Sequence, residues 1–231
     1  MARIVKKAEE RRSEILQKAQ ELFYTHGYAK TSVSMVIDAL GISKGAFYHY
    51  FKSKEELLDS LAAFLSQNIK SRIEAGVNDQ NLNAIEKLNN MYYESGSYKV
   101  ENIDFIMTIT EALYSDDNLL LRFKFQNKSL EHFVPLLAKI FQQGKEEALF
   151  NIEKPEVMAR IVLLFGMSIA EHNAKLILQL TNHPEKLDEI INNLSIYQRS
   201  VERMLNAPEN SVIAFDKKFF EAFKEKLVST K

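Results

Sequence analysis

Residues that break helices are scarce in this chain. Its 231 residues include only 7 glycines and 4 prolines, and no proline precedes Pro135. Apolar residues recur at spacings of three and four, and no strand-like alternation of apolar and polar residues occurs. Because glycine and proline mark most joints between elements, this pattern predicts an all-α fold of long helices with short connections.

Composition excludes several classes of protein. Hydrophobic residues make up 46% of the chain and charged residues 26%, the balance of a globular protein with a sizeable core. No cysteine is present, which excludes a disulfide framework and a thiolate metal site. The longest apolar run, residues 161–170, has about half of the ~20 residues that a membrane span needs. The N-terminus also lacks an apolar signal stretch, so we expect a cytoplasmic protein with no membrane partner.

Charge is distributed unevenly along the chain. The formal net charge is −1. Residues 1–54 nevertheless hold ten Lys and Arg against five Asp and Glu, and residues 55–231 are acidic overall. A small basic region on a larger acidic body indicates that the N-terminal part meets a polyanion. Ordinary surface charge would give a similar excess, so composition alone leaves both interpretations open.

Turn and capping residues place the expected helices. Gly27 and Gly41 can end the first two, Thr31 or Ser32 can cap the second, and Ser43 can cap the third. Pro135 falls inside a long apolar stripe and should kink that helix. The helices that we expect cover residues 7–25, 31–40, 43–50, 53–75, 83–95, 101–115, 117–147, 155–179, 184–205 and 215–228.

Residues 31–54 carry the strongest functional signal. With Gly41 as the turn, Val36 and Leu40 lie on one face of the second helix, and Phe47 of the third can close over them. This is the pattern of a helix-turn-helix. We therefore expect a DNA-binding domain over residues 1–54, followed by a helical domain over residues 55–231.

The other face of the third helix is small, basic or hydrogen-bonding, and no acidic residue occurs between Gly41 and Lys54. A helix that enters the major groove must present such a face, because apolar bulk would clash and carboxylates would be repelled by phosphate. Hydroxyl groups at the start of the preceding helix can hold a further phosphate. The residues that we expect to contact double-stranded DNA are Thr31, Ser32, Ser34, Ser43, Lys44, Gly45, Ala46, Tyr48, His49, Tyr50 and Lys54.

Residues 15–58 resemble the N-terminal DNA-binding domain of TetR-type transcriptional regulators. The segments that carry the resemblance are Leu22-Phe23, His26-Gly27-Tyr28, Thr31-Ser32-Val33, Gly41-Ile42-Ser43-Lys44-Gly45, Phe47-Tyr48-His49-Tyr50-Phe51 and Lys54-Glu55-Glu56-Leu57. Ile37 departs from the alanine that is usual in that family, and its larger side chain should alter the helix crossing slightly. The resemblance implies a homodimer, a palindromic operator and a small-molecule effector bound in the C-terminal body.

The spacing of the histidines in the sequence does not match that of a metal site. No histidine has a glutamate three residues before it, as a di-metal helical bundle would require. No glycine-rich phosphate loop or nucleophile elbow occurs either. We therefore expect no metal, no cofactor and no enzymatic activity.

Two further sets of candidate site residues lie in the helical domain over residues 55–231, the body of the protein. Polar and aromatic groups at helical spacing suggest a mostly apolar effector pocket, and we expect its lining to include Tyr92, Phe105, Thr108, Glu111, Phe123, Asn127, His132, Phe165 and His172. A stripe of small residues and an apolar seam on the last two long helices suggest a dimer interface, formed by Gly166, Ala170, Ala174, Ile190, Leu194, Tyr197, Val201 and Met204. Both seams could instead pack within one protomer.

The interpretation that these features favour is a dimeric repressor released by a small, largely apolar effector. One alternative is a DNA-bound protein whose body recruits another protein and takes no small ligand. Another is an all-α enzyme in which the N-terminal domain only stabilises or localises the chain. The effector, the operator and the direction of regulation do not follow from the sequence.

Overall fold

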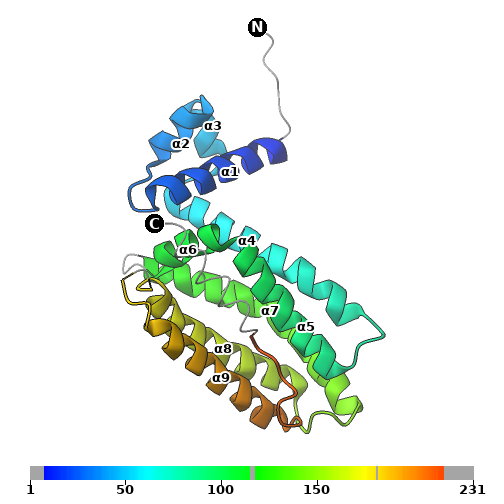
Figure 1. Ribbon diagram of the computed structural model, residues 1–231. Helices are drawn as coiled ribbons and strands as arrows, with labels where there is room; N and C mark the ends of the chain where they lie inside the picture. The colour runs from blue at the N-terminus through cyan, green and yellow to red at the C-terminus, as the bar shows by residue number, and fades with distance from the viewer. Residues whose placement is uncertain (1–7, 115–117, 181, 216–231) are drawn as a thin grey trace. The chain divides into compact units, whose positions relative to one another are not determined.

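The computed structural model describes residues 8–114, 118–180 and 182–215. Over these ranges the chain forms nine α-helices and no strand, which confirms the expected all-α fold (Figure 1). No helix in the described ranges is long and apolar enough to cross a membrane. The helices are α1 (Ala8–His26), α2 (Val33–Leu40), α3 (Lys44–Tyr50), α4 (Lys54–Asn78), α5 (Ala84–Glu101), α6 (Ile103–Leu113), α7 (Leu119–Glu146), α8 (Pro155–Ile177) and α9 (Lys186–Leu205).

Local sequence signals set most of these boundaries. Gly27 and Gly41 have φ angles of +80° and +60° and end α1 and α2. Pro155 is the first residue of α8, where its missing N–H would have no helical partner. The expected helix over residues 83–95 instead continues through Gly96 to Glu101, and it ends at Asn102. Apart from Phe215, the helix expected over residues 215–228 lies outside the described residues.

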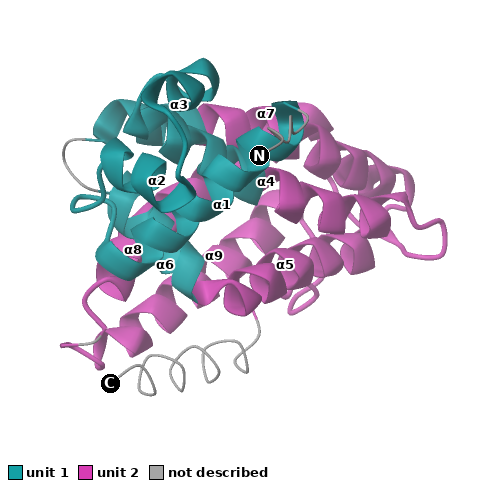
Figure 2. Ribbon diagram, turned by 90° about the horizontal axis from the view of Figure 1, so that it is seen from above, with its two compact units in different colours: residues 1–65, 104–125 teal, residues 66–103, 126–231 magenta. Residues whose placement is uncertain are grey.

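The chain divides into two compact units, which Figure 2 shows in different colours. Unit 1 contains residues 1–65 and 104–125, and unit 2 contains residues 66–103 and 126–231. Residues 54–65 of α4 therefore belong to unit 1, and residues 66–78 of the same helix belong to unit 2. The functional boundary expected between residues 54 and 55 stays a prediction.

Unit 2 has an apolar core formed by side chains of α5, α7, α8 and α9. Phe150 packs edge-on against Phe141, with ring centroids 5.8 Å apart. It also covers Gly144 so closely that an added Cβ would lie 2.0 Å from its ring. The other buried side chains of this core include Leu88, Leu137, Ile140, Val162, Ile190, Val201 and Leu205.

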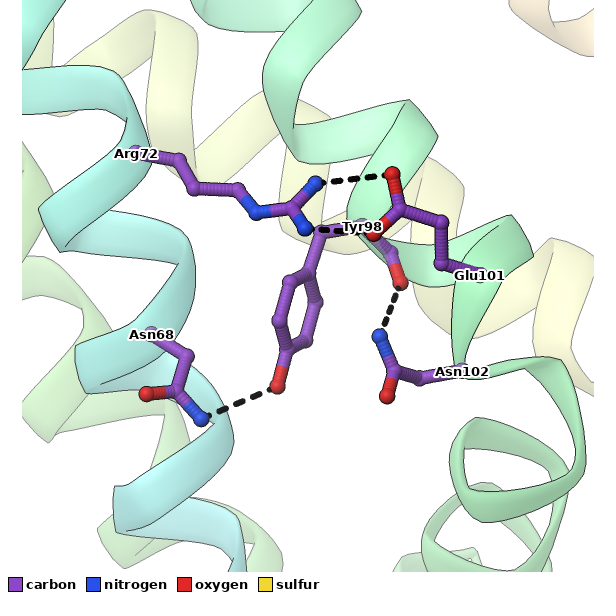
Figure 3. Close-up of polar contacts among 5 residues, drawn as sticks. All are labelled: Asn68, Arg72, Tyr98, Glu101 and Asn102. Carbon is purple, nitrogen blue, oxygen red and sulfur yellow. Dashed lines mark hydrogen bonds and ion pairs between the residues drawn. The ribbon is translucent and has the colours of Figure 1, made fainter.

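A polar cluster joins α4 and α5 within unit 2 (Figure 3). The Asn68 side-chain amide donates to the Tyr98 hydroxyl at 3.0 Å, and the Arg72 guanidinium forms an ion pair with Glu101 while its Cζ lies 5.0 Å from the centre of the Tyr98 ring. The Asn102 side-chain amide donates to the Tyr98 carbonyl at 2.9 Å and ends α5. The second half of α4 is thus fastened to the C-terminal end of α5.

The segment after α9 is held by side chains that bind its backbone. The amide group of Asn89 donates to the carbonyl of Ser211 at 2.8 Å and accepts the N–H of Ile213 at 2.8 Å. The Glu202 carboxylate accepts the N–H of Val212 at 3.1 Å, and Val212 itself is fully buried. These contacts connect α5 and α9 through the chain that follows α9.

The structure corrects part of the predicted dimer interface. Ala174, Ile190, Tyr197 and Val201 are buried within the protomer, so they are not available to a partner. Gly166 also faces inward, because an added Cβ would lie 3.0 Å from the Tyr197 hydroxyl of the same chain. These residues therefore pack α8 against α9 of the same chain. This agrees with the alternative that both seams pack within one protomer. Ala170, Leu194 and Met204 keep accessible surface and stay predictions.

The left-handed backbone at Gly41 generates the first testable prediction. Space is not the constraint, because an added Cβ would meet nothing within 4 Å. Gly41→Ala should nevertheless lower the free energy of unfolding by about 1–2 kcal/mol, the cost of a left-handed conformation for an L-residue. Gly45→Ala is the matched control, because Gly45 lies in α3 without a positive φ; there we expect a gain of about 0.4–1 kcal/mol. Urea denaturation measures both, and equal losses would contradict the assignment.

Candidate nucleic-acid interface

The first three helices of unit 1 pack around a small apolar core. Ile15, Ala19 and Phe23 of α1 are buried against Val36 and Ile37 of α2 and Phe47 of α3. Ile37, which departs from the usual alanine, is accommodated inside this core. The core continues into α4 through Leu57, Leu58 and Leu61, which are also buried.

Helix α3 is anchored by a single buried side chain. Of its seven residues only Phe47 is buried, and it is fully inaccessible. Phe51 immediately follows the helix, donates its backbone N–H to the Phe47 carbonyl at 3.0 Å and is also fully buried. These two aromatic residues fix which face of α3 turns inward and therefore which face is exposed.

The turn before α3 is closed by backbone and side-chain hydrogen bonds. The N–H of Gly41 donates to the Asp38 carbonyl at 3.1 Å, and the N–H of Ile42 donates to the Ile37 carbonyl at 3.2 Å. The Ser43 hydroxyl then accepts the N–H of Ala46 at 3.1 Å and caps α3. Both predicted signals, the glycine turn and the serine cap, are therefore confirmed.

The outward face of α3 has the composition that the sequence indicated. Ser43, Lys44, Gly45 and His49 are exposed, and Tyr48 is 49% exposed. Ala46 and Tyr50 are half-buried at the margins of this face. No carboxylate lies on α3 or in the segment that connects it to α4, so nothing on this face would repel a phosphate.

The start of α2 offers a second set of donors. The Ser32 hydroxyl accepts the N–H of Met35 at 3.2 Å and caps the helix, and both Ser32 and Ser34 are exposed. The first turn of a helix leaves N–H groups without intrahelical partners, which favours an anion at this end. This arrangement agrees with the phosphate contact expected from the sequence.

Two of the residues predicted to contact DNA form hydrogen bonds inside the domain. Thr31 is buried, and its hydroxyl lies 3.1 Å from the Leu22 carbonyl and 2.9 Å from the Gly27 carbonyl. The Lys54 ammonium donates to the carbonyls of Tyr28 and Thr31 at 2.8 and 2.9 Å. It also lies 4.2 Å from the centre of the Tyr28 ring. Both side chains are therefore engaged in hydrogen bonds inside the domain, and their contacts with phosphate stay predictions.

Lys54 therefore joins the start of α4 to the loop between α1 and α2. Burial lowers the pKa of Lys54, and the neighbouring Glu55 carboxylate opposes that shift. Burial also raises the pKa of Tyr28 to about 12, with Glu55 adding to the shift. Lys52, two residues before Lys54, is exposed and was not among the residues expected to contact DNA.

Comparison with known proteins identifies this domain. Residues 15–61 match the model of the bacterial regulatory proteins of the tetR family. The DNA-binding domain of this chain, residues 15–61, is therefore of the tetR type.

Curated relatives of this chain are transcriptional regulators. The transcriptional repressor KstR2 of Mycobacterium tuberculosis is 33% identical over 95 residues, which are 41% of this chain and 47% of the relative. The uncharacterized regulator YuxN of Bacillus subtilis is 30% identical over 189 residues, which are 78% of this chain and 60% of the relative. The chain thus spans about half the length of the curated relatives that it matches.

Likeness to solved structures extends over most of the chain. The SmeT–triclosan complex superposes with a TM-score of 0.56 at 17% identity, covering 90% of this chain and 98% of SmeT. At this identity the likeness concerns the fold.

The predicted pocket residues are divided between the two compact units, and the pocket stays a prediction. Phe105, Thr108, Glu111 and Phe123 belong to unit 1, whereas the other five belong to unit 2. Glu111, Phe123, Asn127 and His172 are exposed. The Thr108 hydroxyl donates to the Asp104 carbonyl of its own helix at 2.9 Å, so that proton is not free for a ligand.

Two predicted pocket residues do converge in unit 2. The hydroxyls of Tyr92 and Tyr197 lie 3.0 Å apart, and the rings of Phe165 and Tyr197 are 5.4 Å apart. Tyr197 had been assigned to the dimer seam, because a seam residue and an inward-facing residue have the same helical spacing. His132 lies elsewhere, with its Nδ1 3.1 Å from the buried Ser66 hydroxyl. Burial lowers the pKa of His132, and Lys70 and Lys128 lower it further.

His172 pairs with Glu189 across α8 and α9, with 3.3 Å between the Nε2 and Oε1 atoms. Over the described ranges, no three His, Asp or Glu side chains are grouped so as to hold a metal ion.

The buried Thr31 hydroxyl generates a second prediction. Thr31→Val should leave two carbonyls without this donor and lower the free energy of unfolding by about 1–2 kcal/mol. Ser34→Ala, at an exposed position on the same side of the turn, should change it by less than about 0.5 kcal/mol. Urea denaturation compares the two variants. A Thr31→Val protein as stable as the parent would mean that the hydroxyl is free for another partner.

Proposed function

We propose that this chain is a transcriptional regulator that binds an operator as a homodimer, represses transcription and is released by a small effector. The observation that carries the proposal is the exposed, acid-free face of α3, oriented by the buried Phe47. The match to the tetR family over residues 15–61 supports the same conclusion. KstR2, which is 33% identical to this chain over 95 residues, is a transcriptional repressor.

Each exposed side chain has a role that its chemistry supports. Lys44 can donate to a guanine edge or a phosphate, and Gly45 and Ala46 allow the helix to approach the bases closely. Tyr48 and His49 donate to phosphates and set the position of the helix rather than the sequence that it reads. A further phosphate would lie at the start of α2, with Ser32 and Ser34.

A palindromic operator requires two copies of α3 about 34–36 Å apart. We propose that the copies are joined through the outer face of α8 and α9. Val157, Ile161 and Leu164 repeat along α8 at spacings of four and three and are 51%, 45% and 47% exposed. Ile196 of α9 is 43% exposed. Apolar side chains in such a row are typical of a helix that packs against another helix.

Release of the operator by an effector follows from thermodynamic linkage between the ligand site and the DNA-binding site. SmeT, which has this fold, has been solved with triclosan, and we propose that this chain also binds a small apolar molecule in its body. Helix α4 is fastened through Leu57, Leu58 and Leu61 to the DNA-binding core and through Asn68 and Arg72 to α5. A ligand that favours one arrangement of the body would bias α4 and thus the spacing of the two α3 helices. DNA must then weaken ligand binding by the same factor.

Duplex binding tests the first part of the proposal. Selection from a random duplex library should yield an inverted repeat whose half-site centres lie about 10–10.5 base pairs, or a multiple, apart. Lys44→Ala and Tyr48→Ala should each lower affinity for that duplex by about tenfold, since one charged or positioning contact is worth about 1–3 kcal/mol. Lys128→Ala, at an exposed lysine of α7 in unit 2, is the control and should bind as the parent does.

Fluorescence anisotropy at several salt concentrations gives the affinities and the salt dependence. The Lys44→Ala variant should also show a shallower salt dependence, because fewer counterions are released. If both α3 variants bind as tightly as the parent and unfold at the same temperature, α3 does not contact the operator.

The proposed dimer face generates a separate prediction. Leu164→Glu places a carboxylate on the exposed row of α8 and should shift the protein from dimer to monomer in sedimentation velocity. Tyr93→Glu is the control, because Tyr93 is 62% exposed on α5, outside the row, and this variant should remain dimeric. A Leu164→Glu protein that stays dimeric would exclude this face.

A further inference from the structure

Lys54 is the first residue of α4, a position that does not favour a cation. The N-terminus of a helix carries a partial positive charge, so acidic residues such as Glu55 and Glu56, which follow Lys54, are preferred in the first turn. A lysine at this place therefore needs compensating contacts. Its side chain is half-buried, and its ammonium is directed at the loop between α1 and α2, residues 27–32.

Three backbone carbonyls of that loop surround the Lys54 ammonium. It donates to the carbonyls of Tyr28 at 2.8 Å, Thr31 at 2.9 Å and, at a longer distance of 3.4 Å, Ala29. An ammonium group has three N–H donors and no acceptor, so the three carbonyls account for all of its hydrogens. Without Lys54, the partly buried carbonyls would lose a donor, which is costly when no other partner replaces it.

The Tyr28 side chain adds an aromatic surface to this contact. The centre of its ring lies 4.2 Å from the Lys54 Nζ, and the ring packs edge-on against the buried Phe23 with centroids 5.1 Å apart. The Tyr28 hydroxyl oxygen is buried and has no hydrogen-bond partner among the described residues. Tyr28 therefore contributes its ring, and not its hydroxyl, to holding the ammonium. We call Lys54 together with Tyr28, Ala29 and Thr31 the Lys54 clasp.

The Lys54 clasp joins the two ends of the helix-turn-helix. Thr31 immediately precedes Ser32, the cap of α2, and Lys54 lies shortly after Phe51, the residue that ends α3. Thr31 and Lys54 are 23 positions apart, and both α2 and α3 lie within this interval. A contact that closes the interval restricts the conformations of the chain inside it. The clasp thus limits how far the start of α2 can move relative to the end of α3.

We propose that Lys54 is a positioning residue for operator binding, whose ammonium closes the helix-turn-helix and holds the start of α2 where α2 and α3 can contact one duplex together. This inference rests on the proposed function. The sequence predicted a phosphate contact for Lys54, and the two roles differ in where the charge acts. A phosphate contact places the charge against DNA. The clasp places it against carbonyls of the domain and acts on DNA through the exposed Ser32 and Ser34.

Amide hydrogen exchange without DNA tests the clasp itself. The Thr31 N–H donates to carbonyls within the loop, and the Met35 N–H donates to the Ser32 hydroxyl at the start of α2. In Lys54→Met, which keeps an unbranched side chain but removes the donors, both amides should exchange about tenfold or more faster relative to the Phe51 N–H at the end of α3. Exchange ratios equal to those of the parent would overturn the clasp.

Three further variants control for charge and for folding. Lys52→Met removes an exposed lysine two residues before Lys54 and should leave these exchange ratios unchanged. Tyr28→Leu removes the ring without changing the charge of the domain and should raise the ratios as Lys54→Met does. Tyr28→Phe, which keeps the ring and removes only the unpartnered hydroxyl, should exchange as the parent does. Circular dichroism melting shows which variants are folded, and Tyr28→Leu gives the same readout if Lys54→Met does not fold.

The salt dependence of duplex binding separates positioning from a phosphate contact. Lys44→Ala removes a proposed charge contact, and its plot of log affinity against log salt should be shallower by about 0.9 per contact, or about 2 for a dimer. Lys54→Met and Tyr28→Leu should lower the affinity for the selected duplex by about tenfold and keep the slope of the parent. A slope in Lys54→Met as shallow as that of Lys44→Ala would show a direct phosphate contact and overturn the proposal. An affinity equal to that of the parent would overturn it as well.

The two arms of the experiment distinguish this inference from the proposed function. A parent protein that selects no duplex would contradict the proposed regulator, whatever the exchange rates of its variants. A parent that binds its duplex, while Lys54→Met and Tyr28→Leu exchange and bind as the parent does, would overturn the positioning role of Lys54 and leave the regulator intact.

Discussion

The burial of Phe47 is the interaction on which the rest of the account depends. Helix α3 has seven residues and one buried side chain, so this aromatic ring, together with Phe51 directly after the helix, determines which face of α3 is accessible. Phe51 continues the same packing into the connection with α4. An isolated helix of this length has no stability of its own in water, and the shape of the exposed face is therefore a consequence of the core beneath it.

The sequence predicted this part of the molecule well because its signals are local. A glycine with a left-handed backbone, a serine cap and apolar residues at helical spacing act over a few residues, and Gly41, Ser43 and Phe47 occupy the expected places. Thr31 and Lys54 differ, because their side chains are engaged inside the domain, and their DNA contacts stay predictions. Their hydrogen-bond partners lie 4 to 26 residues away, and a residue type alone does not reveal whether its hydrogens are already used.

The C-terminal body shows the limit of what the helical spacing of apolar residues can predict. Tyr197 and Val201 lie on an apolar stripe of α9, as predicted, but a stripe does not specify whether its partner helix belongs to the same chain. In the structure the stripe packs against α8 of the same protomer, and a different, exposed row that contains Ile161 and Leu164 remains.

The central claim is that the exposed face of α3 lies against duplex DNA. A photoreactive phenylalanine analogue placed at residue 48 tests it most directly, with the same analogue at residue 93 as a comparison, since both positions hold exposed tyrosines. The account predicts a covalent crosslink to the selected duplex from residue 48 and none from residue 93. Crosslinking from residue 93 but not from residue 48 would contradict it.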